Sequence, residues 1–454
     1  MKRMMVLSIL CIVLIFTSGS MGHVSAQTLA ERGNMPWRIE PVIQNSDIKS
    51  ISVANDSKYG NAAPLIAYYD KPTSKFREAI FWGDGLGDCG MNNAWKCGYA
   101  HDWFDDEGGY NDVGFFPMRQ GLYDQTSYVY SVADDNALYL KTNYTPQKSP
   151  GERLLAFGAY PAGMPGSQPS MALDVNGLPH IAVVVDGTPD DYLVYIHPAP
   201  GLGNCPGGDS TFDCETILVG PNVAADPSIT LMSNFSLRIA YYDPINGALG
   251  VAYLYGYPGV DECGPDTEWH CIIIDDLLNN GWFPSIALGS DAVTYIGYYN
   301  YSTGALMLAQ YVHHNGNCGL TWNGSSYELM WQCDQIDQVS AGVTKLGLSL
   351  AMDGTVPVLA YMNSTGFQPT VDIAQPAWRL GMDVGNCGPI DLFYTWYCQT
   401  LVSGQYPMGG EIDMVINDSG ALHIAFTEQN IDEHQTYLWS ARQYFLQYMP
   451  VLTK

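Results

Sequence analysis

The chain has 454 residues, with 46 acidic and 19 basic side chains, and its formal net charge is −27. This excess of acid repels phosphate backbones and anionic lipid headgroups, which excludes nucleic acid and anionic membrane surfaces as partners. After the N-terminal segment no run reaches the ~18 apolar residues that a membrane helix requires, so we expect no membrane insertion.

The first 26 residues have the pattern of a secretory signal peptide. Two basic residues precede an apolar run, and Val24-Ser25-Ala26 places small residues around a cleavage point near Ala26. We therefore expect 1–26 to be removed and the mature protein to be secreted into the extracellular space. Cleavage also removes Cys11 and leaves ten cysteines, an even number that is typical of disulfides in an oxidising compartment.

One pattern recurs along the rest of the chain. The stretch "DPSITLMSNFSLRIAYYD" (226–243) returns as "FPSIALGSDAVTYIGYYN" (283–300), and a degenerate copy fits at 114–121. Each copy reads as four short strands, the first alternating small and apolar residues and the second following a turn rich in Asp, Asn and Gly. Repeats of this size indicate stacked supersecondary units. Weaker copies start at Ser50, Ser170, Ser349 and Asp413.

Seven such units without any helical periodicity predict an all-β, seven-bladed β-propeller with four-stranded antiparallel blades. Small first-strand residues leave room around a narrow channel. A six-bladed ring is the alternative, because the second unit has a poor first strand and no cysteine. The propeller is expected at 27–445, followed by a C-terminal tail at 446–454. Its blades are predicted at 47–103, 112–158, 167–221, 226–276, 283–338, 346–403 and 411–443.

The ten cysteines fall into local pairs, each between the third and fourth strand of one unit. A disulfide that closes a loop of this size is worth ~2–3 kcal/mol on the chain-entropy model. No pair has the spacing of a zinc site, so we expect no metal bound by these thiols. The predicted bridges are Cys89–Cys97, Cys205–Cys214, Cys263–Cys271, Cys318–Cys333 and Cys387–Cys398.

Residues 36–43 are predicted to close the ring. Four of the fourth strands contain Trp-x-Cys, and Trp37 and Ile39 stand in the corresponding places near the mature N-terminus. The last unit, 411–443, offers only three strands and has no cysteine. An N-terminal strand that pairs with this unit would complete its sheet and cover the unpaired edge.

Polar residues that follow the second strands are the first candidates for a ligand site. If these strands end on one face, their carboxylates and amides can bind sugar hydroxyls or a cation such as Ca²⁺. The same residue types also begin turns by bonding to their own backbone. We expect no other cofactor and no other metal. The candidates are Asp70, Asp186, Asp243, Asn300, Asn363 and Glu428.

Aromatic residues in the loops before the first strands are the second group of candidates. Trp282 and Tyr406 lie in loops that are expected on the same face. Exposed aromatic rings stack on sugars and peptides, but rings at these positions can equally cover the junctions between blades.

Two segments resemble a known group of proteins. "PSMALDVNGLPHIAVVVD" (169–186) and "GNCGPIDLFYTWYC" (385–398) are similar to secreted bacterial β-propellers of the sialidase/BNR-like superfamily. That group contains glycosidases, lectins and adhesive surface proteins, so the resemblance implies an architecture rather than one activity. The sialidase pattern itself is not matched: "NGNCGLTW" (315–322) departs from the Asp-box, and no three arginines share a blade position.

These features predict a secreted binding module that recognises glycans or extracellular proteins at the loop face around the channel. One alternative is a sialidase-like glycoside hydrolase or lyase with carboxylates near the channel mouth. Such an enzyme would need two carboxylates about 5–10 Å apart, and the sequence singles out no pair and no catalytic residue. The other alternative is a structural cell-surface protein.

Overall fold

The computed structural model describes residues 36–443 apart from several gaps. The predicted signal peptide, the C-terminal tail and Tyr406 lie outside the described residues. The gaps are at 45, 57–62, 100–106, 117–124, 133–136, 144–150, 158–163, 166–168, 188, 200, 202, 206–210, 232–236, 255–258, 266–267, 277–278, 340, 342–346, 364–368, 389–395, 405–407, 431–434.

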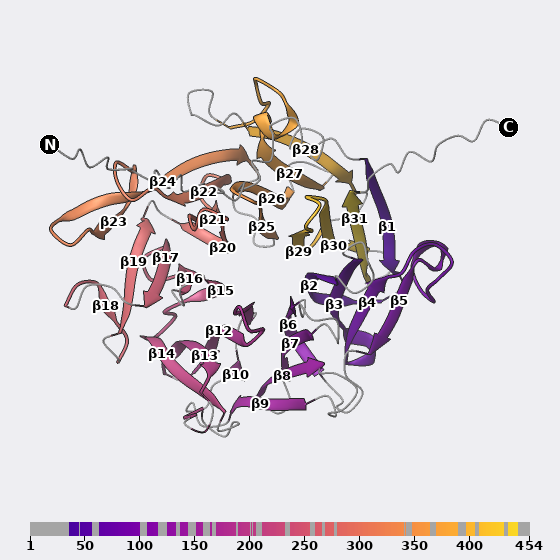
Figure 1. Cartoon of the computed structure of the whole chain (residues 1–454), viewed down its shortest axis with the longest axis horizontal. Coiled ribbons are helices and arrows are strands. Elements are labelled where there is room, and N and C mark those ends of the chain that lie inside the picture. The colour runs from indigo at the N-terminus through magenta and orange to yellow at the C-terminus, as the bar shows by residue number, and fades with distance from the viewer. Residues whose placement is uncertain are drawn as a thin grey trace, which may run out of the picture.

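Seven antiparallel sheets are arranged in a ring around a central opening (Figure 1). Each sheet is one blade, and its main strands follow one another outward from the centre in chain order, except that β1, the first strand of the chain, is the outermost strand of the last blade. The second unit forms a complete four-stranded sheet, β6-β7-β8-β9. The prediction of a seven-bladed propeller is therefore confirmed, and the six-bladed alternative is wrong.

The first three blades contain the following strands. Blade one consists of β2 (Ile48–Asp56), β3 (Ala63–Asp70), β4 (Lys75–Phe81) and β5 (Trp95–Tyr99). Blade two consists of β6 (Glu107–Phe116), β7 (Gln125–Val132), β8 (Ala137–Asn143) and β9 (Gly151–Phe157). Blade three consists of β11 (Ser170–Leu173), β12 (Pro179–Asp186), β13 (Asp191–Pro198), β14 (Phe212–Gly220) and the short β10 (Met164–Pro165).

The next three blades follow the same plan. Blade four consists of β15 (Ala225–Leu231), β16 (Leu237–Asp243), β17 (Ala248–Leu254), β19 (Trp269–Asp275) and the short β18 (Glu262–Cys263). Blade five consists of β20 (Asn280–Leu288), β21 (Thr294–Asn300), β22 (Ala305–Tyr311), β24 (Tyr327–Gln338) and β23 (Cys318–Trp322). Blade six consists of β25 (Leu348–Asp353), β26 (Val356–Asn363), β27 (Thr370–Pro376) and β28 (Trp396–Ser403).

Blade seven joins the first and the last strands of the described chain. The strand β1 pairs antiparallel with β31 over its whole length, which confirms the predicted closure. The only helices in the described ranges are short 3-10 turns, and none of them is long and apolar enough to cross a membrane. The strands of this blade are β29 (Met408–Ile416), β30 (Leu422–Asn430), β31 (Gln435–Gln443) and β1 (Trp37–Ile43). The 3-10 turns lie in other blades: η2 (Lys71–Thr73) and η3 (Met91–Asn93) in blade one, and η4 (Ala377–Leu380) in blade six.

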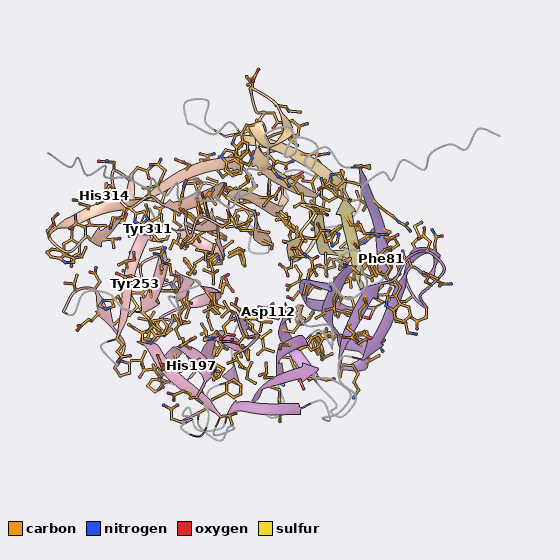
Figure 2. All side chains as sticks on the ribbon, in the orientation of Figure 1. Phe81, Asp112, His197, Tyr253, Tyr311 and His314 are labelled. Atoms are coloured by element: carbon orange, nitrogen blue, oxygen red, sulfur yellow. A yellow bond between two sulfur atoms is a disulfide. The ribbon has the colours of Figure 1, made fainter. Side chains whose placement is uncertain are left out.

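A buried ion cluster stabilises the closure. Glu40, which is 1% exposed, accepts hydrogen bonds from Trp95 Nε1 of blade one (3.1 Å), Arg442 Nη2 of β31 (2.9 Å) and Arg38 Nε (2.7 Å). The Arg442 guanidinium also lies 3.4 Å from the ring centre of Phe81. Figure 2 labels Phe81 in blade one. One carboxylate thus links the closing strand to both neighbouring strands of the ring.

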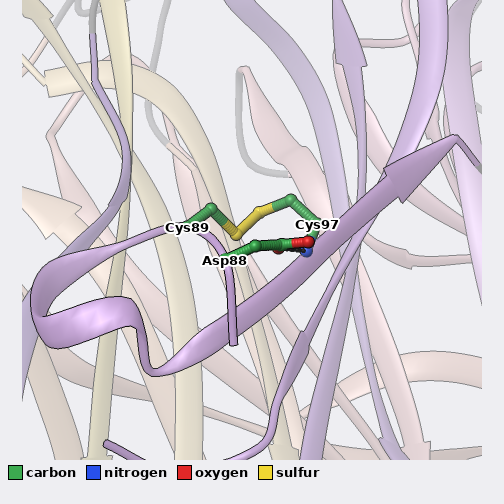
Figure 3. Close-up of side chains that lie close together, drawn as sticks. All are labelled: Asp88, Cys89 and Cys97. Atoms are coloured by element: carbon green, nitrogen blue, oxygen red, sulfur yellow. Dashed lines mark hydrogen bonds between the residues drawn. A yellow bond between two sulfur atoms is a disulfide. The ribbon is translucent and has the colours of Figure 1, made fainter. Parts of the chain in front are cut away.

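All five predicted disulfides are present, each within one blade. Figure 3 shows the first, between Cys89 and Cys97, beside Asp88, whose carboxylate accepts the Cys97 N–H (2.9 Å). Asn317 accepts the Cys333 N–H in the same way (2.6 Å). The recurring Asp or Asn before the first cysteine therefore aligns the loop with the fourth strand. Five disulfides fit an oxidising environment.

The register corrects two alignments made from the sequence. The first strand of blade two is β6, which begins at Glu107, so the degenerate copy expected at 114–121 was placed too late. In blade one Ser52, not Ser50, corresponds to Ser170, because each pairs with an alanine of its second strand. A bulge between Lys49 and Ile51 shifts the first strand and hid this correspondence.

Candidate functional site

A ring of seven polar side chains surrounds the channel. The first strand of each blade is an edge strand there, so its backbone N–H groups need acceptors from elsewhere. In every blade a Ser or Asp accepts one N–H from the first strand of the next blade. The contacts run from Val113 N to Ser52 Oγ (3.1 Å), Met171 N to Asp112 Oδ2 (2.6 Å), Ile229 N to Ser170 Oγ (3.2 Å), Ile286 N to Ser228 Oγ (3.1 Å), Leu350 N to Ser285 Oγ (2.9 Å), Met414 N to Ser349 Oγ (3.0 Å) and Val53 N to Asp413 Oδ2 (2.6 Å).

We call these seven acceptors the channel ring. Their contacts pass from blade to blade and close on themselves, so the recurring serine is a joint between neighbours as well as a small residue. Blade two takes part through Asp112, which Figure 2 shows beside the central opening. The sequence analysis did not find Asp112, because its blade was aligned in the wrong register.

The two carboxylates of the channel ring flank Ser52. The Ser52 hydroxyl lies 2.6 Å from Asp112 Oδ1 and 3.3 Å from Asp413 Oδ2. Burial, with the charge of Asp413 as a further cause, raises the pKa of Asp112 to about 7, and burial raises the pKa of Asp413 as well.

Asp413 is fully committed to the ring. It accepts hydrogen bonds from the backbone N–H groups of Val53 and Met414 and from the Ser349 hydroxyl (2.6–2.8 Å). The Ser52 hydroxyl, whose single proton lies nearer to Asp112, is 3.3 Å from it, so both oxygens of Asp413 already face groups of the protein. The geometry therefore assigns Asp413 to holding the ring together rather than to chemistry.

A second layer of side chains lies two positions before the channel ring. In three blades β-bulges give the residue at this position a positive φ: 46° at Ser50, 49° at Asp226 and 51° at Phe283. This conformation is uncommon outside glycine, and bulges often re-aim side chains next to functional sites. We call Ser50, Asp226, Phe283, Gly347 and Glu411 the bulge layer.

The bulge layer and the channel ring line one cavity of about 850 Å³. The bulge layer varies in chemistry from blade to blade, with hydroxyl, carboxylate and aromatic groups, whereas the channel ring is nearly uniform. Lys49 and Lys71 also line the cavity, and Lys71 Nζ pairs with Asp47 Oδ2 at 3.1 Å. Five carboxylates against two amines make the lining acidic.

Asp226 differs from the carboxylates of the channel ring. Within the described residues its carboxyl group has neither a hydrogen-bond donor nor an ion-pair partner, although it lines the cavity. Burial raises its pKa to about 6. A desolvated carboxyl group that is not used by the fold is the strongest functional candidate in the cavity.

The six polar residues predicted at the second-strand ends lie elsewhere. None of Asp70, Asp186, Asp243, Asn300, Asn363 and Glu428 lines the cavity. Asp243 accepts the N–H groups of Ile245 (2.9 Å) and Asn246 (3.0 Å), and Asn300 accepts that of Thr303 (2.9 Å). These bonds are the turn contacts that were the alternative for these residues, and a ligand-binding or Ca²⁺-binding role for the group stays a prediction.

Trp282 lies next to the bulge layer but is already stacked. Its ring centre is 4.8 Å from that of Tyr301 and 4.7 Å from that of Tyr242. Its neighbour Phe283 lines the cavity, as does Tyr69. The sequence signal that could have identified the bulge layer is the variable residue before Pro-Ser, Asp in "DPS" and Phe in "FPS".

Comparison with known proteins adds the architecture only. No protein-family model matches the chain, and no curated protein matches it. Distant structural similarity exists to other propellers, at identities and TM-scores too low to carry an argument about function. The fucose-specific lectin from Aleuria aurantia has 14% identity and a TM-score of 0.41, with 82% of this chain and 99% of that chain covered.

Two enzymes give similar values. The intramolecular trans-sialidase from Ruminococcus gnavus has 12% identity and a TM-score of 0.37, with 88% of this chain and 94% of that chain covered. The PQQ-bound aldose sugar dehydrogenase from Streptomyces coelicolor has 12% identity and a TM-score of 0.36, with 72% and 92% covered. Binding proteins and enzymes thus occur together among the similar structures.

Proposed function

We propose that the protein is a secreted binding module that holds the hydroxyl-rich end of a glycan in the channel cavity. The observation that carries this proposal is the carboxyl group of Asp226, which lines the cavity and has no hydrogen-bond or ion-pair partner among the described residues. The cavity volume of about 850 Å³ falls within the range of ~300–1,000 Å³ that small-ligand sites occupy.

The cavity offers the contacts that a sugar requires. Asp226 can accept hydrogen bonds from sugar hydroxyls, and Phe283 offers an apolar surface to the C–H face of a ring. The hydroxyls of Ser170, Ser228 and Ser285 accept backbone N–H groups, but no described residue accepts their own protons. The acidic lining selects against sulfated or sialylated chains, so we assign the site to neutral glycans.

The test is a glycan array with neutral oligosaccharides, followed by calorimetry on the best ligand. We expect Asp226→Asn to weaken binding about ten-fold or more, which is about 1.4 kcal/mol or more of binding free energy. Asp383→Asn is the matched control, because Asp383 is exposed and remote from the cavity. Unchanged affinity in Asp226→Asn, or an array on which nothing binds, would overturn the proposal.

Acidity gives a second readout of the same contact. The ionised carboxylate of Asp226 accepts the hydrogen bonds of the ligand, so its protonation below the pKa of about 6 removes this acceptor. Affinity should therefore decrease as the pH falls from 7 to 5 in the wild type and change much less in Asp226→Asn. Calorimetric titrations at these two pH values measure the difference.

Hydrolysis of a glycoside is the second candidate function. A carboxyl group whose pKa is about 6 retains its proton in mildly acidic solution, as a general acid must. Glu411 lines the same cavity and is the carboxylate that could complete a pair. Turnover of a fluorogenic neutral glycoside that is abolished by Asp226→Asn and retained by Asp383→Asn would establish an enzyme instead of a binding module.

A further inference from the structure

Blade three carries three metal-ligating side chains on one face of its sheet. His197 of β13 lies opposite Asp213 of β14, and Tyr195 lies opposite Glu215, so the register places His197, Asp213 and Glu215 on the same side. One ligand atom from each of the three lies within 4.8 Å of the others. Figure 2 shows His197 in this blade, away from the central opening.

The contacts around the cluster orient its ligand atoms. His197 Nε2 lies 2.8 Å from Glu215 Oε1, and Trp269 Nε1 of blade four donates to Glu215 Oε2 (2.8 Å). His197 Nδ1 lies 3.3 Å from the carbonyl oxygen of Pro198. Because Nε2 faces a carboxylate oxygen, it donates its proton to Glu215 in this arrangement, and a metal ion would replace that proton while Nδ1 keeps its contact with the backbone carbonyl.

An unsatisfied polar atom points independently to a missing partner. Asp213 Oδ1 is buried and has no hydrogen-bond donor in the part of the chain that the structure describes. Buried carboxylate oxygens are nearly always paired, so such an atom needs an explanation, and an absent cation is one. The side chains of His197 and Glu215 are 23% and 25% exposed, which leaves a path for an ion from solvent.

Three other blades act as internal controls for this combination. The corresponding three positions of their sheets carry no histidine with two carboxylates, whereas in blade seven they carry Arg442, Arg38 and Glu40, and Glu40 accepts from Arg442 and Trp95 as Glu215 does from His197 and Trp269. The corresponding residues are Tyr253, His270 and Ile272 in blade four, Gln310, Gln332 and Asp334 in blade five, and Gln375, Tyr397 and Gln399 in blade six.

A second group of ligand types in the described residues can be set aside. Asp88, Cys89 and Cys97 lie equally close together, but both sulfur atoms belong to a disulfide (Figure 3). Asp88 is also hydrogen-bonded to the Cys97 N–H and to Lys96. The cluster in blade three contains no disulfide, and although Glu215 is hydrogen-bonded, Asp213 Oδ1 has no donor among the described residues.

We propose that His197, Asp213 and Glu215 form a binding site for a divalent transition-metal ion, and that zinc fits it best. One imidazole nitrogen with two carboxylate oxygens is a set of three protein ligands that leaves a fourth, open position on zinc. The two carboxylates balance the charge of the ion. The three ligand atoms lie at most 4.8 Å from one another. Small side-chain rotations would bring them close enough to form metal–ligand bonds of ~2.0–2.2 Å with one ion.

The test is calorimetric titration of tag-free, chelator-treated protein with ZnCl₂. We expect one equivalent of zinc to bind and to raise the melting temperature. His197→Gln and Asp213→Asn should each weaken binding ~10-fold or more, and Ca²⁺ should not compete, because it prefers oxygen ligands in larger numbers. Two variants guard against a single folding defect, and circular dichroism checks each fold.

His314→Gln is the matched control. His314 Nδ1 lies 2.9 Å from Glu328 Oε2, so this His–Glu pair resembles the cluster but has no third ligand among the groups identified in the described ranges. Full zinc binding in His314→Gln with loss in the two blade-three variants supports the site. The absence of zinc binding by the wild type, or an equal loss in all three variants, would overturn it. Neutral-glycan binding is independent of this site and should be unchanged throughout.

Discussion

At the scale of single residues, the channel ring shows how one position serves two chemistries. Ser and Asp both accept the N–H of the next blade, but only Asp carries a charge into a poorly solvated channel. Burial consequently raises the pKa of both ring carboxyl groups. Asp112 of blade two and Asp413 of blade seven lie on either side of Ser52 of blade one. Repulsion between the two carboxylates therefore acts where β1 closes the ring.

Asp112 should make the stability of the protein depend on pH. Its pKa is about 7 in the folded chain and ~3.9 in the unfolded chain, so folding binds a proton between these values. The stabilisation is complete below about pH 4 and is lost as the pH rises through about 7. We expect the free energy of unfolding of the wild type to decrease from pH 5 to pH 8 more steeply than that of Asp112→Asn.

Urea unfolding at several pH values measures this slope. The absolute stability of Asp112→Asn will be lower, because the Asn side chain has an NH₂ group where Asp has an oxygen, and this group faces a hydrogen-bond donor of the channel ring. The slope is therefore the readout, and Asp383→Asn should retain the wild-type slope. Parallel slopes in the wild type and Asp112→Asn would contradict the raised pKa.

At the scale of elements, the loop between third and fourth strands is set by close contacts as well as by its disulfide. Two positions before the first cysteine a glycine lies against the backbone of the buried tryptophan of the fourth strand. A Cβ at Gly316 would come 2.0 Å from the carbonyl oxygen of Trp331, and a Cβ at Gly385 would come 1.9 Å from that of Trp396. The recurring Gly-Asn-Cys sequence thus encodes a contact with the strand that it precedes.

Gly316→Ala should destabilise the protein by ~1–3 kcal/mol, because the added methyl group forces the loop away from β24. Gly98→Ala is the control: the nearest atom to its Cβ would be 3.9 Å away, at the end of the Glu78 side chain. Thermal unfolding under oxidising conditions compares the two. Equal melting temperatures for both variants would show that the loop yields without cost.

At the scale of the whole molecule, stability depends on the junction of the first and last strands. The strand β1 contributes Glu40, which is buried among Trp95, Arg38 and Arg442. Removing one partner of a buried ion pair leaves an uncompensated charge, at a cost of about 3–5 kcal/mol. Among the described sheets this is the one that joins the first strand to the last three, so contacts of β1 stabilise the closed ring.

Glu40→Ala should therefore lower the free energy of unfolding by about 3–5 kcal/mol. Lys71→Ala removes the exposed ion pair with Asp47 and should cost less than about 1 kcal/mol. Denaturant titration of both variants gives the comparison. A Glu40→Ala protein as stable as Lys71→Ala would mean that backbone pairing of β1 alone closes the ring.

The sequence by itself determined the repeat, the five disulfides and the closure by β1. These features depend on local periodicity, on cysteines close together in the chain and on one unit that lacks a strand, and all of these can be read without coordinates. The resemblance to the sialidase-like group implied no more than the architecture that the structure has.

Only the tertiary structure decided which side chains enter the channel and which meet on the blade-three sheet. In blade one Ser50 and Ser52 alternate with apolar residues, so the sequence allows either serine to be aligned with the other blades, and only the strand pairing identifies Ser52 as the channel residue. The channel-lining position of Asp226 and the meeting of His197 with Asp213 and Glu215 depend on closed blades and exact strand pairing. Such contacts join residues that are separated in the chain, so short-range patterns cannot reveal them.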